Sequence, residues 1–77
     1  MPKPQKADEV FRILKRHDPR FQVFANRGKG SHRMIFHPDI SGEKRSFPVP
    51  YHKGQDLRQG MLSALLRRFD LPRDLFG

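Results

Sequence analysis

The sequence predicts an α+β fold in the order α-β-β-β-α, with a three-stranded antiparallel sheet that carries two helices on one face. Apolar residues recur at helical spacing near both ends of the chain, and strand-forming residues alternate in the middle. Two amphipathic helices and a sheet bury their apolar faces by packing together, which gives two layers. The 77 residues suffice for one core, so we expect a single domain over residues 1–77.

The first helix is expected over residues 7–17. It follows a Pro- and Lys-rich segment, residues 1–6, which we expect to be frayed. Apolar side chains such as Val10 and Leu14 recur at helical spacing and form one stripe. The helix should end before Pro19, because the residue that precedes a proline disfavours the α region.

Three short strands are expected in the middle of the chain, over residues 21–27, 31–37 and 44–49. Residues 28–30 and 38–42 should form the turns between them, so the strands pair as an antiparallel meander.

The side-chain alternation predicts which residues leave the core. If Val23, Met34 and Phe36 face the helices, then Phe24 and Ile35 lie on the open face of the sheet. Apolar side chains exposed there would indicate an interaction surface.

The helical pattern returns from about residue 55. Gly60 weakens the start of this helix, so regular helix is expected only from about there. Residues 71–76 are expected to form a last turn that packs Leu75 and Phe76 on the core. The apolar stripe of the second helix is formed by Met61, Leu62, Leu65, Leu66 and Phe69.

The composition points to an anionic partner. The chain carries 16 Lys and Arg against 8 Asp and Glu, a formal net charge of +8, and this surplus attracts polyanions. Cysteine is absent, which excludes disulfides and Cys-ligated zinc, and no apolar run is long enough to span a membrane. We therefore expect a cytoplasmic protein with no membrane partner, and no cofactor in so small a domain.

The densest group of reactive residues lies in the first turn and the start of the next strand, residues 28–33. Glycines let the backbone approach a phosphate, and the amides of a turn form an anion-binding concavity. His32 is the natural group to take a proton from a ribose hydroxyl near neutral pH. The residue types alone fit equally well a plain hairpin turn with a histidine packed at the sheet edge. RNA contacts are expected from Lys29, Gly30, Ser31 and Arg33.

The other histidines give weaker indications. His52 is a possible secondary site, as a proton-transfer group or phosphate contact, but we favour a structural role, and Lys53 beside it is a plausible phosphate contact. His17 and His37 are expected to be structural or solvated. The spacings between the four histidines match no compact metal pair, so no metal site is expected.

Three motifs occur in a distinctive order. Gly-Ser-His at residues 30–32 is followed by Pro-Tyr-His-Lys-Gly at residues 50–54 and Gly-Met-Leu-Ser-Ala-Leu-Leu-Arg at residues 60–67. In this order the sequence resembles the HicA family of toxin mRNA interferases, over residues 8–69. The resemblance implies a fold like that of a double-stranded-RNA-binding domain, metal-independent cleavage of mRNA, silencing by a HicB-like antitoxin, and His32 as the catalytic histidine.

Two departures from the family pattern leave substrate preference open. Asp-Pro-Arg-Phe at residues 18–21 stands where a Gly-Phe pair is usual, and Met61 replaces a threonine. The chain also lacks the lysine-rich opening of the second helix that is typical of simple duplex-binding domains.

The sequence thus predicts an endoribonuclease in which His32 acts as general base on a ribose 2′-hydroxyl. A non-catalytic RNA-binding module with the same basic hairpin is the alternative, and a membrane- or acidic-protein-binding adaptor is a weaker third. We expect no binding to DNA by the chain alone.

Overall fold

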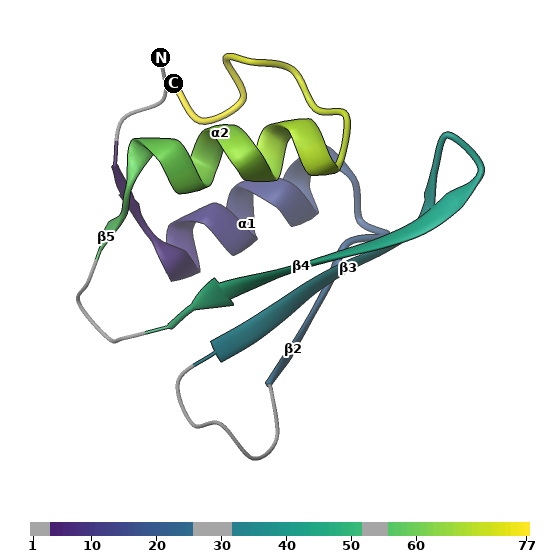
Figure 1. The fold of residues 1–77 in the computed structure, drawn as a ribbon, viewed down its shortest axis with the longest axis horizontal. Coiled ribbons are helices and arrows are strands. Elements are labelled where there is room, and N and C mark those ends of the chain that lie inside the picture. The colour runs from purple at the N-terminus through teal and green to yellow at the C-terminus, as the bar shows by residue number, and fades with distance from the viewer. Residues whose placement is uncertain (1–3, 26–31, 52–55) are drawn as a thin grey trace.

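The computed structural model describes residues 4–25, 32–51 and 56–77, and it confirms the α+β fold (Figure 1). Strands β2, β3 and β4 form an antiparallel sheet in the order β2-β3-β4, and both helices lie on one side of it. The elements are β1 (Gln5–Lys6), α1 (Ala7–His17), β2 (Gln22–Ala25), β3 (His32–Ile40), β4 (Glu43–Pro50), β5 (Asp56–Leu57) and α2 (Gln59–Arg68).

The core lies between the helices and the sheet. Its largest fully buried side chains come from both helices, from β3 and β4, and from the segment after α2. The buried hydrophobic residues are Ala7, Val10, Leu14, Phe21, Ile35, Ile40, Val49, Leu57, Leu62, Leu65, Leu66, Phe69 and Phe76. The apolar stripe predicted for α2 is therefore confirmed, and so is the packing of the C-terminal turn on the core.

The predicted alternation of β3 is wrong by one residue. Val23, Ile35 and Phe47 are neighbours across the three strands, and Ile35 is fully buried. Met34 and Phe36 therefore point away from the helices together with Phe24. The sequence predicted instead that Met34 and Phe36 face the core and that Ile35 lies on the open face. The prediction of apolar side chains on the open face holds, but with a different set of residues.

The second turn is shorter than predicted. The sequence assigns residues 38–42 to a turn, yet β3 continues to Ile40, and only Ser41 and Gly42 connect it to β4. Both have positive φ, 53° and 84°, as in a two-residue type I′ hairpin turn. The pairing register shifts between His37 and Ile40. Pro38 is tolerated within β3 because this irregularity removes a ladder hydrogen bond that a proline cannot donate.

The N-terminal segment differs from its prediction as well. Gln5 and Lys6 are not frayed but pair with Leu57 and Asp56 as the two-stranded sheet β1-β5. The side-chain amide of Gln5 also donates to the backbone carbonyl of Phe76. The strand before α1 is thus hydrogen-bonded both to β5, the strand before α2, and to the C-terminal turn.

The C-terminus of α2 is closed by a Schellman motif. The backbone N–H of Leu71 donates to the carbonyl of Leu66 (2.8 Å), and that of Asp70 donates to the carbonyl of Arg67 (3.3 Å). This motif requires a left-handed backbone conformation at the residue that precedes Leu71. That residue is Asp70, which has a φ of 55°. A glycine adopts that conformation without steric cost, whereas an aspartate does not.

Asp70→Gly should therefore stabilise the protein. Relief of the left-handed strain is worth about 1 kcal/mol, which corresponds to a rise in Tm of about 4–8 °C in a domain of this size. Thermal unfolding followed by circular dichroism measures the change. Asp70→Ala is the control, because it removes the charge and keeps the strain. An equal rise in Tm for both variants would contradict the account.

Candidate functional site

His32 is the first residue of β3, and its side chain is exposed. Its backbone partner is Pro50, the last residue of β4, so it lies at the end of the sheet. Because Ile35 and His37 on the same strand are buried among the core residues, alternation turns His32 to the outer face with Met34. None of the described residues makes a hydrogen bond or ion pair to its imidazole ring.

Arg33, the next residue, points to the helix side of the same sheet end. The carbon at the centre of its guanidinium lies 4.3 Å from the centroid of the Tyr51 ring, a cation-π arrangement. Tyr51 in turn stacks on Phe11 of α1, with ring centroids 6.2 Å apart and planes inclined by 15°. The Arg33 side chain is therefore held by packing on the helix side of β3, the strand that also carries His32.

A carboxylate from α1 completes this arrangement. The Tyr51 hydroxyl donates to the carboxylate of Asp8, with both oxygens at 3.0 Å. The hydrogen bond to Asp8, together with burial and the negative charge of Asp8, raises the pKa of Tyr51, and the cation of Arg33 opposes that rise. We call Asp8, Phe11, Arg33 and Tyr51 the Tyr51 cluster. Sequence reasoning missed it, because no local pattern links residues 43 positions apart.

The remaining predicted site residues fall outside the described part of the chain. Lys29, Gly30 and Ser31 belong to residues 26–31, and His52 and Lys53 to residues 52–55. Their roles stay predictions.

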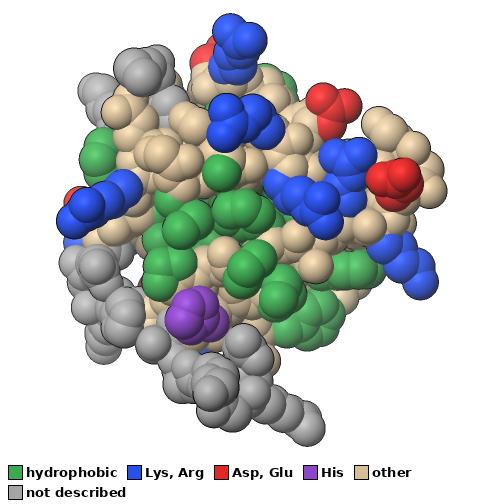
Figure 2. Space-filling view, in the orientation of Figure 1, with side chains coloured by type: hydrophobic (Ala, Val, Ile, Leu, Met, Phe, Trp, Pro, Cys, Tyr) green, Lys and Arg blue, Asp and Glu red, His purple; other side chains and the backbone are tan. Residues whose placement is uncertain are grey.

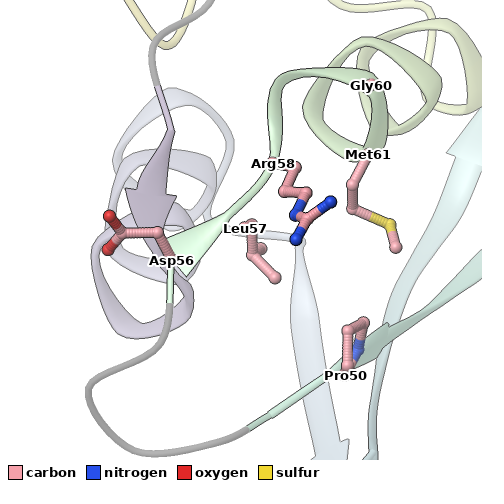
Figure 3. Close-up of a pocket in the computed structure, with 6 residues that line it drawn as sticks. All are labelled: Pro50, Asp56, Leu57, Arg58, Gly60 and Met61. Carbon is pink, nitrogen blue, oxygen red and sulfur yellow. The ribbon is translucent and has the colours of Figure 1, made fainter.

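A pocket of about 420 Å³ opens next to Pro50, between the end of β4, β5 and the start of α2 (Figure 3). Leu57, Met61 and Pro50 give it apolar walls, and the Arg58 side chain reaches across it between Leu57 and Met61. Pro50, the backbone partner of His32, thus lines the pocket. The other lining residues that the structure describes belong to β5, to α2 and to Arg58 between them, and none belongs to β3.

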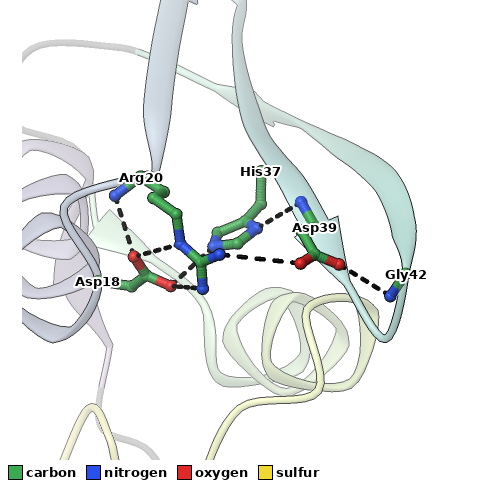
Figure 4. A network of polar contacts seen from close by, with 5 residues as sticks. All are labelled: Asp18, Arg20, His37, Asp39 and Gly42. Atoms are coloured by element: carbon green, nitrogen blue, oxygen red, sulfur yellow. Dashed lines mark hydrogen bonds and ion pairs between the residues drawn. The ribbon is translucent and has the colours of Figure 1, made fainter.

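A second histidine is bound in a polar network at the opposite end of the sheet (Figure 4). His37 is 1% exposed, and its Nε2 donates to Oδ2 of Asp18 at 2.8 Å. Its Nδ1 accepts the backbone N–H of Asp39 at 3.0 Å. Arg20 binds the same Asp18 carboxylate in a fork, through Nε at 3.1 Å and Nη2 at 3.0 Å.

The His37–Asp18 pair has the appearance of a catalytic dyad, but its contacts leave no ring nitrogen for a substrate. Both nitrogens are occupied and the ring is buried against Phe21, at a centroid distance of 4.7 Å. The structure therefore gives His37 a structural role. His17, at the end of α1, is exposed, although its helical spacing matches the buried stripe.

Neither a metal site nor a membrane span is found in the described residues. No three His, Asp or Glu side chains gather there in a way that could hold a metal ion. In the same residues, no helix is long and apolar enough to cross a bilayer.

The surface around the sheet combines apolar and basic side chains. In the space-filling view, hydrophobic side chains gather over the strands and beside α2, with Lys and Arg around them (Figure 2). Such a surface suits a partner that presents both negative charge and flat apolar groups.

Comparison with known proteins gives one family. The model of the family described as the HicA toxin of bacterial toxin-antitoxin systems matches residues 7–71, most of the chain. Neither the curated proteins nor the solved structures give a match.

The Asp18 network generates a pH-dependent prediction. Hydrogen bonds from the Arg20 side chain and backbone, and then from His37, hold the pKa of the Asp18 carboxyl well below its usual range. A lowered pKa in the folded state stabilises the fold above about pH 4, and this contribution is lost as the pH falls through the folded pKa. Asp18→Ala should cost about 1–3 kcal/mol at pH 7, because the buried N–H of His37 loses its acceptor.

Urea denaturation of both proteins from pH 7 to pH 2 tests this. The difference in free energy of unfolding should be constant near neutral pH and narrow below about pH 4. Asp74→Ala, at an exposed carboxylate of the C-terminal turn, is the control and should change little. A difference independent of pH would show that the charge of Asp18 plays no part.

Proposed function

The chain belongs to the HicA family of toxins of bacterial toxin-antitoxin systems, and from this premise we propose that it is an endoribonuclease that cleaves mRNA with His32 as general base. The observation that carries the proposal is the contrast between the two described histidines of β3. His37 is buried with both ring nitrogens occupied, whereas His32 is exposed at the end of the strand, and no described residue makes a hydrogen bond to its ring. His32 can therefore reach a substrate and exchange a proton with it.

The proposed cleavage requires a group that accepts a proton, and an exposed neutral imidazole is such a group. The neutral imidazole of His32 takes the proton of a ribose 2′-hydroxyl, and the oxygen attacks the adjacent phosphorus. The bond to the 5′-oxygen breaks, which leaves a 2′,3′-cyclic phosphate and a 5′-hydroxyl. The leaving oxygen takes its proton from water, or from Lys29 or His52, which lie outside the described residues. In this scheme no metal or cofactor takes part.

Negative charge grows on the phosphate during attack, and cations near it stabilise the transition state. Arg33 is the described cation next to His32, and its guanidinium is held on the helix side by Tyr51. An RNA backbone that crosses this end of the sheet meets His32 on one side and Arg33 on the other. Lys29, Gly30, Ser31 and Lys53 are proposed as further RNA contacts.

Membership of a toxin-antitoxin family implies a cognate antitoxin. We propose a HicB-like protein that covers His32 and is acidic, because the net charge of +8 steers such a partner to this chain. A non-catalytic RNA-binding module remains the alternative function. It shares the basic surface, but it has no need for a free imidazole at position 32.

His32→Ala should abolish cleavage and leave the fold intact. Loss of a general base lowers a rate by about 10²- to 10⁴-fold, whereas truncation of an exposed side chain changes stability by less than about 0.5 kcal/mol. The measurement is the cleavage of a long mRNA in EDTA, corrected for the folded fraction by circular dichroism. Persistent cleavage in EDTA is expected for the parent.

His17→Ala is the matched control, since His17 is also exposed but lies at the far end of α1. It should cleave like the parent. If His32→Ala also cleaves like the parent, the proposed mechanism is wrong. If the parent binds RNA but never cuts it, the RNA-binding module becomes the function.

Arg33→Gln should weaken RNA binding mainly at low salt. For a single strand, each phosphate contact contributes about 0.7 to the slope of log affinity against log salt, so the slope should become shallower by about that amount. Filter binding between 50 and about 300 mM salt measures it. Arg73→Gln, at an exposed arginine of the C-terminal turn, should leave the slope unchanged. Equal slopes for the parent and Arg33→Gln would exclude a phosphate contact by Arg33.

A further inference from the structure

The outer face of the sheet carries aromatic side chains that the proposed reaction does not use. Phe24 is 50% exposed, the one large hydrophobic side chain among the described residues that is so open to water. Its ring centroid lies 6.4 Å from that of Phe36, with the planes inclined by 59°. Met34 pairs with Phe24 on one side and with Pro48 on the other. We call Phe24, Met34, Phe36 and Pro48 the apolar platform.

The platform is continuous with His32. Along β3, His32, Met34 and Phe36 alternate with inward-facing residues and share the outer face. Two residues of a strand span about 7 Å, so the apolar platform begins one side-chain row away from His32. A ligand that lies on the platform therefore extends directly to the candidate catalytic ring.

The charges of this face favour an anionic ligand. In the part of the sheet that carries the platform, the outer positions hold no carboxylate. These positions are Gln22 and Phe24 on β2, His32, Met34 and Phe36 on β3, and Ser46, Pro48 and Pro50 on β4. The chain as a whole has a net charge of +8. A polyanion can therefore approach the platform without repulsion from that face, and the cations around it attract the ligand.

We propose that the apolar platform binds unpaired bases of the RNA, which stack on Phe24 and Phe36 while the backbone leads to His32. The inference rests on the proposed function, and it narrows the substrate to single-stranded RNA. Bases in a duplex already stack on one another, whereas splayed bases offer a free face to an aromatic ring. Such stacking tolerates any base, because every base has a π-face.

The test is the affinity for a labelled single-stranded RNA, measured by fluorescence anisotropy in the His32→Ala background, where cleavage cannot interfere. Phe24→Leu keeps an apolar side chain but removes the ring, and it should weaken binding about fivefold or more. The salt dependence should not change, since no cation is lost. Phe24→Tyr keeps the ring and should bind like its parent. Because Phe24 is half-exposed, both variants should fold, which circular dichroism verifies.

The outcomes separate this inference from the proposed function. Cleavage by the chain with His32 intact tests the function on its own. If that chain does not cleave but Phe24→Leu still weakens single-strand binding, the function fails and the platform stands. Unchanged affinity in Phe24→Leu would overturn the platform, and so would an equal loss for duplex RNA. A loss confined to the complex with the acidic antitoxin would also overturn it, and would make this face a protein-docking surface.

Discussion

β3 is paired on both edges, so its backbone is fixed in the sheet and each side chain must enter either the core or the outer face. Ile35 and His37 lie on the core side and are buried. Because β3 is paired with both β2 and β4, it cannot rotate to expose them. This constraint turns His32 outward, away from the buried polar network, and it places Met34 and Phe36 in the same row. The candidate catalytic ring and the apolar platform are therefore consequences of one buried strand.

The position of α1 over that strand is set by a carboxylate at each end. Asp8 in its first turn accepts a hydrogen bond from Tyr51, beside His32. Asp18 at its C-cap accepts one from the buried His37, at the other end of β3. The Tyr51–Asp8 hydrogen bond lies on the exposed surface, where water can replace it and where it contributes little. The Asp18 contact joins a charged acceptor to a buried ring, so the C-terminal end of the helix cannot shift along the sheet without leaving the N–H of His37 unsatisfied.

Much of this architecture is predictable from the sequence, because periodicity and turn residues act locally. The bounds of α1 and the apolar stripe of α2 follow from helical spacing and from Pro19. The alternation of β3 does not follow, since Met34, Ile35 and Phe36 are consecutive apolar residues and fit either face equally. Burial of His37 decides between the two, and it depends on Asp18, which is 19 residues away. No local sequence pattern indicates a hydrogen-bond partner that lies so far away in the chain. The Tyr51 cluster escaped prediction for the same reason.

The arrangement also gives a direction for approach to His32. On the helix side of the sheet end, an RNA strand meets the carboxylate of Asp8, and the cation of Arg33 is already engaged with Tyr51. On the outer face the described positions next to His32 carry no carboxylate, and the RNA strand meets the half-exposed ring of Phe24 and the imidazole of His32. Coulombic repulsion by Asp8 is partly screened in water. The Tyr51 ring on the helix side is already in contact with Phe11 and Arg33, whereas the Phe24 ring on the outer face is half-exposed and can take a base. In the proposed complex the bases of the RNA therefore lie on the outer face of the sheet, and only the backbone passes from there toward Arg33.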